Sequence, residues 1–308
     1  RGHDVTLWGR DPDYVDATRH RRENVRYLKG VTLPKALRLT ADAEDALQGA
    51  QVVVNAVPTQ FVRGTFEPLA PLVPARVPVL SLSKGIEVRT LLRPSQVLGE
   101  LLPKRPIAVL SGPSHAEEVA RRSPASVVVA ARSHPLARKF QSALSTERFR
   151  VYTNLDPAGV ELAGALKNVV AIAAGICDGL GFGDNAKAAL VTRGLVEISR
   201  LAAKLGARRS TFAGLAGMGD LVTTAFSRHG RNRAVGEKLG QGKTLGEILD
   251  KMNMVAEGVE TTRSALALAR RHRVDMPIVR EVHEILFEEK NPLDALTSLM
   301  TRSTKTEI

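Results

Sequence analysis

One lysine in this 308-residue chain lies in surroundings that suit proton transfer. Lys167 stands in GALKNVV, next to Leu166 and close to Val169, on a segment whose apolar residues indicate a buried helix. Burial lowers the pKa of an ammonium group, and a lysine tuned in this way can exchange a proton with a substrate oxygen. The alternative is a long side chain that snorkels to solvent, which is the commoner situation for a lysine considered alone.

A second group of chemically active side chains lies in GLAGMGDLVTTAFSRHGRNR. The glycine-rich turn presents Asp220, followed by Thr224, and a carboxylate near a catalytic lysine can orient it or relay its proton. Arg231 and Asn232 suit a phosphate dianion, although a flexible basic loop is the alternative. Further on, MVAEGVETT places Glu257 at a helix entry, where it is either part of the site or only a charge favoured by the helix dipole.

Three strand-like segments of the N-terminal half end in groups that suit a ligand. PVLSLSKG leads to Lys84, IAVLSGPSHAEE leads to Gly112 and Ser114, and VVVNAVPTQ ends in small residues that let a cofactor approach. Open α/β sheets bind ligands at the carboxyl ends of their strands. The SGPS turn would offer N–H groups and a hydroxyl to an anion at a helix start. Ordinary turns and plain helix capping by Ser114 are the alternatives.

The segment DVTLWGRD ends in Gly9-Arg10, where a dinucleotide-binding strand usually carries an acidic residue for the ribose of NAD. A carboxylate would repel a 2′-phosphate, whereas the Arg10 guanidinium can bind it and stack on adenine. Arg10 therefore favours NADP over NAD, with an ordinary solvent-facing arginine as an equal alternative. No G-x-G-x-x-G loop precedes this strand, and the pieces GLGFG and GLAGMGD lack the required strand-loop-helix context.

Short β-branched runs alternate with helical segments up to about residue 152. DVTLWG, QVVVNAV, VPVLSLS, IAVLSG and SVVVAA are typical of strands covered on both faces, and DAEDALQGA and SHAEEVARR of helices. This pattern predicts a Rossmann-like, mostly parallel α/β domain over residues 1–152. Helical patterns fill residues 153–308 and predict an all-helical substrate domain. Gly206 should end one helix, while Pro277 and Pro292 should begin two others.

The composition limits the kind of protein this can be. Lys and Arg outnumber Asp and Glu by 44 to 32, and the formal net charge of +12 attracts anions. Aromatic residues make up only 4% and do not interleave with the basic clusters, which argues against a nucleic-acid partner. The single cysteine, Cys177, fits a reducing cytoplasm, and the longest apolar run is too short to cross a bilayer. We expect no metal site and no membrane span.

Taken in order, several segments closely resemble the bacterial-type NAD(P)-dependent glycerol-3-phosphate dehydrogenases. They are LWGRD, NAVPTQ, LSKGIE, SGPSHAEE, the long block from LKNVV to VTRG, AGMGDLVTT, GRNR and AEGVET, and they extend from the first residue to about 300. The resemblance implies an oxidoreductase that transfers hydride reversibly between NAD(P)H and dihydroxyacetone phosphate, giving sn-glycerol 3-phosphate for phospholipid synthesis. It further implies a cytoplasmic enzyme that uses NADP or NAD and forms a homodimer.

The resemblance also assigns roles to individual residues. Lys167 matches the proton donor and acceptor. The substrate-contacting positions correspond to Lys84, Gly112, Ser114, Lys167, Asp220, Thr224, Gly230, Arg231 and Asn232, and the cofactor-contacting positions to Arg10, Tyr27, Lys84, Ala116, Arg231, Val255 and Glu257. Gly230 departs from the family, which usually has a substrate-contacting serine at this position.

A second departure concerns the family's first strand and glycine-rich loop, which would precede Arg1. Because that strand lies centrally in the family's sheet, we expect a gap in the sheet, weak NADP binding, marginal folding and a longer native protein. Two alternatives stay open. Another two-domain NADP-dependent reductase, such as a ketopantoate reductase, shares the architecture but not the LKNVV and GRNR blocks. An inactive basic fragment would account for the missing loop but not for the intact site residues.

Overall fold

The chain folds into two units, and a short piece of the second interrupts the first. The computed structural model describes residues 2–252, 254–303 and 306. The first unit contains Arg1–Ser83 and Pro94–Pro157, and the second contains Lys84–Arg93 and Ala158–Ile308. The division therefore lies a few residues after the predicted boundary, and the segment that begins at Lys84 belongs to the helical unit.

The first unit is built on a five-stranded sheet. Its strands, in spatial order, are β5 (Val53–Asn55), β6 (Val79–Ser81), β7 (Ile107–Ser111), β8 (Ala125–Ala131) and β9 (Phe149–Asn154). Neighbouring strands run parallel except β7 and β8, which are antiparallel. The predicted Rossmann-like, mostly parallel sheet is thus confirmed.

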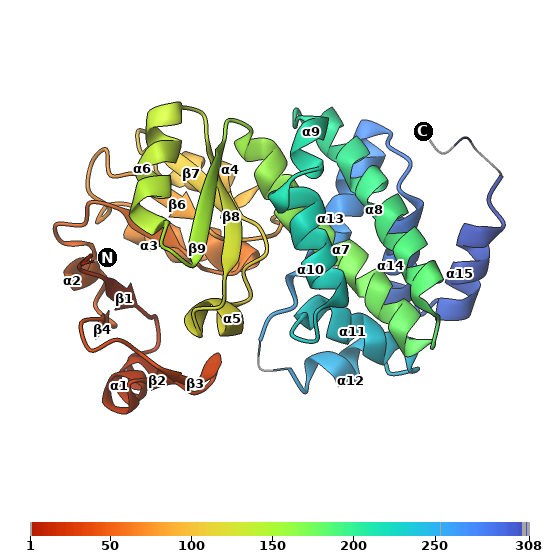
Figure 1. Ribbon diagram of the computed structural model, residues 1–308, viewed down its shortest axis with the longest axis horizontal. Coiled ribbons are helices and arrows are strands. Elements are labelled where there is room, and N and C mark those ends of the chain that lie inside the picture. Colours follow the sequence, from red (N-terminus) through yellow and green to blue (C-terminus); the bar gives the residue numbers. More distant parts are fainter. Residues whose placement is uncertain (1, 253, 304–305, 307–308) are drawn as a thin grey trace. The chain divides into compact units, whose positions relative to one another are not determined.

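Helices cover this sheet and explain the continuous apolar runs of its strands. Val127 and Val129 of β8 pack with Phe140 of α6 in a cluster whose side chains are almost fully buried. Figure 1 shows α6 lying along β8 and β9. The helical elements that follow or connect the strands are η1 (Thr59–Phe61), α2 (Ala43–Leu47), α3 (Val62–Leu69), α4 (Pro94–Leu101), α5 (Ala116–Ala120) and α6 (His134–Leu144).

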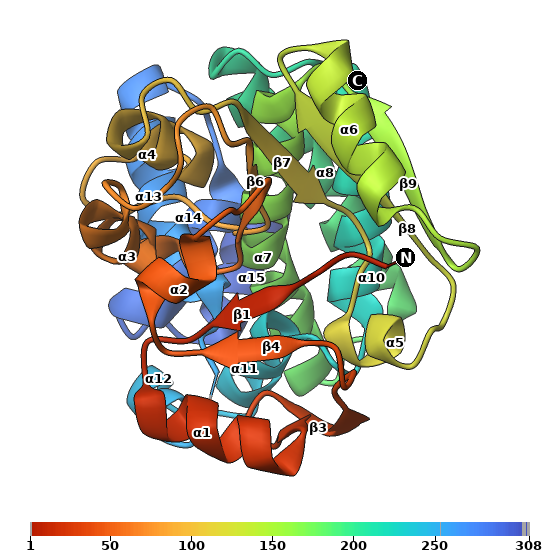
Figure 2. The ribbon, with the colours of Figure 1, turned by 90° about the vertical axis from the view of Figure 1, so that its left-hand side faces the viewer.

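Four short strands near the N-terminus stand apart from the main sheet. Strand β1 (Thr6–Trp8) runs parallel to β4 (Arg38–Thr40), and Figure 2 shows them side by side. Strand β2 (Glu23–Asn24) pairs antiparallel with β3 (Leu28–Thr32), and α1 (Pro12–Arg21) follows β1. Among the described residues neither pair shares hydrogen bonds with β5, so the sheet has the interruption that the sequence predicts.

The second unit is organised around one long helix, α7 (Pro157–Gly179). Every residue from Gly159 to Cys177 is buried, which explains why this segment is apolar nearly all round. The whole helix is long and apolar enough to cross a membrane, unlike the shorter apolar run within it. Its apolar stretch is entirely enclosed by protein, however, as in the central helix of a globular core.

The remaining helices of this unit pack around α7 or on one another (Figure 1). They are α8 (Asp184–Lys204), α9 (Arg209–Phe212), the π-helical turn η2 (Leu215–Gly219), α10 (Asp220–Phe226), α11 (Arg231–Gly240), α12 (Leu245–Leu249), α13 (Glu257–His272), α14 (Pro277–Phe287) and α15 (Pro292–Met300). Gly206, with a φ of +87°, follows α8, and Asn291 caps α15 by accepting the Leu293 N–H at 2.8 Å. The helix ends predicted from glycine and proline are confirmed.

Glycines let α7 and α11 approach each other backbone to backbone. Gly175 and Gly179 on α7 lie opposite Gly236 and Gly240 on α11. A Cβ atom added to Gly236 would lie only 1.9 Å from the carbonyl oxygen of Ile172. Because no side chain fits between the two helices at this point, the glycines set their separation.

A buried carboxylate joins α8 to the start of α14. Glu197 is 4% exposed and accepts the backbone N–H groups of Ile278 at 3.0 Å and Val279 at 2.9 Å. These are first-turn donors that have no partner within their own helix. Burial raises the pKa of Glu197 to about 7 in spite of the two hydrogen bonds that favour its charged form.

We expect Gly236→Ala to lower the free energy of unfolding by about 3 kcal/mol or more, because the added methyl group forces α7 and α11 apart. Gly246→Ala on α12 is the matched control, since nothing lies within 4 Å of its added Cβ. That control should change the free energy of unfolding by less than about 1 kcal/mol, and we expect an increase because alanine favours the helix more than glycine does. Denaturant unfolding followed by circular dichroism measures both, and equal effects would contradict the role given to the close contact.

Candidate active site

Lys167 is buried, and its ammonium group is held by two side chains of α10. The residue is 5% exposed, so it does not snorkel to solvent. Its Nζ donates to Asp220 Oδ1 at 2.7 Å and to the Thr224 hydroxyl. An ammonium group has three hydrogens, and these two bonds account for two of them. The described residues thus leave one donor of Lys167 for another acceptor.

The carboxylate of Asp220 bridges two lysines. Its Oδ1 accepts from Lys167, and its Oδ2 accepts from Lys84 Nζ at 2.8 Å. Asp220 is 2% exposed, whereas about a quarter of the Lys84 side chain is exposed. One negative charge therefore lies between two positive charges, and the three groups together carry a net positive charge that suits an anionic ligand.

Burial and charge together set the protonation of this cluster. Burial lowers the pKa of Lys167 to about 8, the charge of Asp220 opposes that effect, and the positive charges of Lys84 and Arg231 reinforce it. Burial by itself favours the neutral carboxyl of Asp220, yet the adjacent lysines hold its pKa below the usual value. Lys167 can consequently give up and regain a proton near neutral pH while Asp220 stays charged.

The local sequence fixes Asp220 at the start of α10. The π-helical turn η2 precedes it, and π-helical turns are frequent at functional sites. Within η2, a Cβ atom on Gly217 would lie 2.2 Å from the carbonyl oxygen of Phe212, so only glycine fits. One turn after Asp220, the Thr224 hydroxyl donates to the Asp220 carbonyl oxygen at 2.6 Å. This bond orients Thr224 so that its oxygen can accept from Lys167.

The backbone of Lys84 is held from both sides within the second unit. Its N–H donates to Glu257 Oε2 at 3.2 Å, and its carbonyl oxygen accepts from Asn168 Nδ2 at 3.1 Å. Glu257 therefore does more than place a charge at the start of α13. Asn168 is 5% exposed and was not selected from the sequence. A second polar side chain beside Lys167 in an otherwise apolar helix was the signal that could have found it.

Arg231 and Asn232 begin α11 and are each tied to the segment around the start of α13. Arg231 Nη1 donates to the Val255 carbonyl oxygen at 2.9 Å, and Asn232 Oδ1 accepts the Gly258 N–H at 2.9 Å. Gly230 is the N-cap residue of α11 and offers no side chain to cap it. Of the residues selected from the sequence, the second unit contains Lys84, Lys167, Asp220, Thr224, Gly230, Arg231, Asn232, Val255 and Glu257.

The other selected residues, Arg10, Tyr27, Gly112, Ser114 and Ala116, belong to the first unit. Arg10 is exposed between β1 and the N-cap of α1, and Tyr27 lies edge-on to Tyr14 with ring centroids 5.7 Å apart. Gly112 has a φ of +130°, and its added Cβ would lie 3.0 Å from the Cα of Val127, so the turn requires glycine.

Ser114 does not cap a helix, which corrects one of the sequence-based alternatives. Helix α5 begins later, at Ala116, with His115 as its N-cap residue. The Ser114 hydroxyl instead donates to the Gly112 carbonyl oxygen at 3.0 Å. Helix α5 has only five residues, so its N-terminus attracts an anion less than a long helix would.

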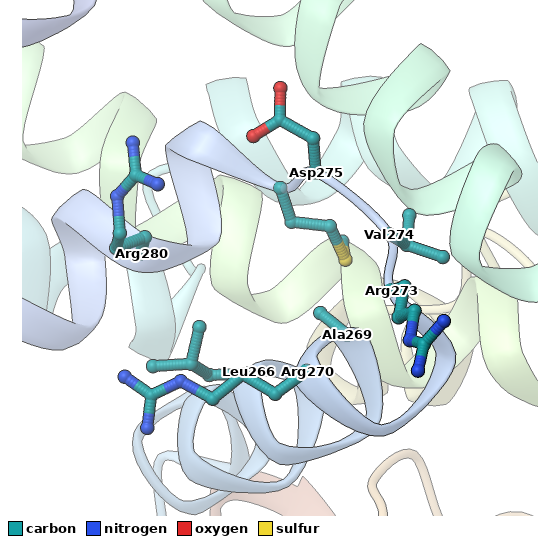
Figure 3. A pocket seen from close by; sticks show the side chains of 8 residues that line it. Leu266, Ala269, Arg270, Arg273, Val274, Asp275 and Arg280 are labelled. Atoms are coloured by element: carbon teal, nitrogen blue, oxygen red, sulfur yellow. The ribbon is translucent and has the colours of Figure 1, made fainter.

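A separate cavity of about 240 Å³ lies at the connection between α13 and α14 (Figure 3). Its apolar lining includes Leu266 and Met276. Arg270, Arg273 and Arg280 also line it and are labelled in Figure 3. Two residues of the basic run RRHR (residues 270–273), Arg270 and Arg273, thus line this cavity. None of its lining residues is among those selected from the sequence, so the cavity is distinct from the two-lysine cluster.

We expect Asp220→Asn to lower the pKa of Lys167 further below about 8, because it removes the negative charge that favours the ammonium form. Titration of the Lys167 Cε resonance by NMR measures this, with the resonance assigned by its loss in Lys167→Arg. Thr224→Val is the matched control, since it removes a hydrogen-bond acceptor but no charge, and should shift the pKa less. An unchanged pKa in Asp220→Asn would contradict the electrostatic account.

Comparison with known proteins identifies the family to which this chain belongs. The profile of the NAD-dependent glycerol-3-phosphate dehydrogenase N-terminus matches residues 1–137, and the profile of the C-terminus of the same enzymes matches residues 156–297. The glycerol-3-phosphate dehydrogenase [NAD(P)+] of Citrifermentans bemidjiense is 50% identical over 310 residues, covering 100% of this chain and 92% of the relative.

Solved structures agree with the sequence matches. The crystal structure of glycerol-3-phosphate dehydrogenase from Coxiella burnetii superimposes with a TM-score of 0.94 at 37% identity, covering 98% of this chain and 92% of the other. A ketopantoate reductase from Ralstonia eutropha, the alternative considered from the sequence, reaches 0.58 at 16% identity over 96% and 92% of the two chains, which shows the fold alone. The chain therefore belongs to the NAD-dependent glycerol-3-phosphate dehydrogenases, a family of oxidoreductases.

Proposed function

We propose that this protein interconverts dihydroxyacetone phosphate and sn-glycerol 3-phosphate with NAD(P)(H), and that the two-lysine cluster of the second unit carries out the proton transfer. The observation that carries the proposal is the buried Lys167 with a pKa of about 8, one uncommitted hydrogen and a charged partner in Asp220. A ketone reduction needs a proton at the carbonyl oxygen, and a donor tuned close to the working pH supplies it efficiently.

Lys167 acts as the general acid in the reduction and as the general base in the reverse direction. Its third hydrogen donates to the substrate oxygen and passes to it as the alkoxide develops. Asp220 and Thr224 hold the other two hydrogens, so the direction of the donor is fixed before the substrate arrives. The negative charge of Asp220 also limits the fall in the pKa of Lys167, which keeps part of it protonated at neutral pH.

Lys84 and the first residues of α11 bind the anionic part of the substrate. Lys84 and Lys167 both donate to Asp220, so a second positive charge lies close to the proton donor. Asn232 uses its Oδ1 for the Gly258 N–H. None of the described residues accepts a hydrogen bond from its Nδ2 group, which is a donor suited to a phosphate oxygen. Arg231 adds a guanidinium that can bind phosphate through paired hydrogen bonds.

The residues present fit a nicotinamide dinucleotide in part. Arg10 is exposed after β1 and has no ion pair or hydrogen bond with the described residues, as a guanidinium reserved for a 2′-phosphate would be. The cofactor-contacting set, carried over from the family, is Arg10, Tyr27, Lys84, Ala116, Arg231, Val255 and Glu257. When bound, the nicotinamide supplies or accepts the hydride. We favour NADP over NAD on the charge of Arg10.

We further propose a cytoplasmic enzyme that supplies sn-glycerol 3-phosphate for phospholipid synthesis and acts as a homodimer. The single buried cysteine supports a reducing compartment, and burial raises the pKa of its thiol so that it stays protonated. The dimer and the metabolic role rest on family membership.

We expect Lys167→Ala to lower kcat for NADPH oxidation with dihydroxyacetone phosphate by a factor of about 10² to 10⁴, because the proton donor is lost. The decrease in NADPH absorbance measures the reaction, with the full-length protein as the sample. Lys167→Arg is the informative control, since it keeps a positive charge but does not release a proton at neutral pH, and it should also be slow. A near-normal kcat in Lys167→Ala would refute the proton-transfer role, and no turnover in the parent protein would refute the proposed reaction.

We expect Arg10→Asp to raise KM for NADPH by about tenfold or more while leaving KM for NADH nearly unchanged, because only NADPH carries the 2′-phosphate that an aspartate repels. Steady-state kinetics with both cofactors measures the ratio. Arg132→Asp is a matched control, since Arg132 is another exposed arginine that follows a strand, here β8. Equal effects of Arg10→Asp on the two cofactors would show that Arg10 does not bind the 2′-phosphate.

A further inference from the structure

We propose that Asp178 is a positioning residue for substrate binding, because it clamps α8, α10 and α11 to the end of α7 and so fixes where the phosphate-binding start of α11 lies. The inference rests on the proposed substrate role of Arg231 and Asn232. It assigns a function to an ion cluster that neither touches the two-lysine cluster nor takes part in proton transfer.

The clamp consists of one carboxylate and two cations from three different helices. Lys187 Nζ, at the start of α8, donates to both oxygens of Asp178 at 2.9 and 2.8 Å. Arg233 Nε, in the first turn of α11, donates to Asp178 Oδ2 at 2.6 Å. Asp178 therefore receives three charge-assisted hydrogen bonds, which are shorter and stronger than neutral ones.

The same clamp reaches the end of α10. Lys187 Nζ lies 4.5 Å from the centre of the Phe226 ring, and Phe226 is the last residue of that helix. A cation over an aromatic face is attracted to it. Helix α10 begins with Asp220, whose side chain binds Lys167. The ion cluster therefore contacts α10 at its other end.

The charges of the clamp are largely withdrawn from water, which makes its geometry specific. The side chains of Lys187, Asp178 and Arg233 are exposed by 8%, 17% and 16%. Glu237 lies 3.4 Å from Arg233 Nη1 and brings the four charges to zero. A buried charge that loses its partner must move or become hydrated, so the helices that carry these groups are held in one arrangement.

The glycine contacts and the clamp constrain different features of the packing of α11 on α7. Gly175 and Gly236 allow α7 and α11 to touch backbone to backbone, which sets their separation. Close packing of this kind sets the separation of the helices, but it adds no directional bond at the start of α11. The bond from Arg233 to Asp178 is directional and lies in the first turn of α11. Arg231 and Asn232 precede Arg233 directly, so a shift of Arg233 also shifts these two residues.

The short link between α10 and α11 makes this placement necessary. Ser227 follows α10, and Gly230, the N-cap residue of α11, has no side chain to fix the helix start. The orientation of α11 therefore depends on the bonds of Arg231 to Val255 and of Asn232 to Gly258, together with contacts farther along the helix. Arg233 is the first residue after the proposed phosphate-binding pair that contacts α7 through a charged group.

The test is the kinetics of Asp178→Asn, which keeps the size of the side chain and removes the charge. We expect KM for dihydroxyacetone phosphate to rise about tenfold while kcat changes less than about twofold. The binding groups are displaced, whereas the contact of Lys187 with Phe226 and the bonds of Asp220 and Thr224 to Lys167 do not involve Asp178 and remain. Arg233→Gln should have the same effect and leaves the pair of Asp178 with Lys187 intact, so it serves if Asp178→Asn folds poorly. Lys187→Arg keeps the positive charge, so its KM should stay close to that of the parent protein.

Glu197→Gln is the matched control, since Glu197 is also a buried carboxylate of the second unit but contacts α14. It should lower stability without changing KM. The proposal is overturned if neither Asp178→Asn nor Arg233→Gln raises KM, if kcat falls instead, or if Glu197→Gln raises KM equally.

Arg231→Met separates this proposal from the one on which it rests. If Arg231→Met does not raise KM for dihydroxyacetone phosphate, the substrate role of Arg231 fails. If it does, and Asp178→Asn does not, only the positioning role fails. When both raise KM, the double variant should raise it by less than the product of the two factors, because the clamp acts through Arg231. Independent, multiplying effects would also count against the proposal.

Discussion

The candidate site depends on one carboxylate placed between two ammonium groups inside a helical core. Asp220 could not stay charged at its depth without Lys167 and Lys84, and Lys167 would lose its proton more readily without Asp220. Each charge thus makes the burial of the others tolerable. The result is a lysine whose pKa lies near the working pH and whose direction is fixed, which is what proton transfer to a carbonyl oxygen requires.

The rest of the second unit serves to keep these groups in place. Helix α7 is buried along most of its length, so Lys167 cannot reach water by a change of rotamer. Glycines bring α11 against α7, and the ion cluster around Asp178 gives that contact a direction. The proposed binding groups and the proposed proton donor therefore belong to one set of packed helices, with separate ion clusters around Asp220 and Asp178.

Much of the fold and the site could be predicted from the chain alone. Strands β5 to β8 follow from β-branched runs, and α8, α14 and α15 follow from their end signals. Lys167 follows from an unusual charged residue in an apolar helix. Asn168 was not predicted because its role depends on a hydrogen bond to the backbone of Lys84, which is distant in the sequence. Ser114 was considered as a helix cap, but the glycine turn before it takes up its hydroxyl and the helix starts two residues later.

The sequence by itself determined the class of the protein, because periodicity, helix ends and residue order are local properties of the chain. It also determined which side chains could do chemistry, since residue type sets charge and proton affinity. Only the tertiary structure decided which of them act together. The pairing of Lys84 and Lys167 through Asp220, the transfer of segment 84–93 to the helical unit, and the link of Asp178 to α11 are long-range contacts. Such contacts arise from packing, which no local pattern encodes.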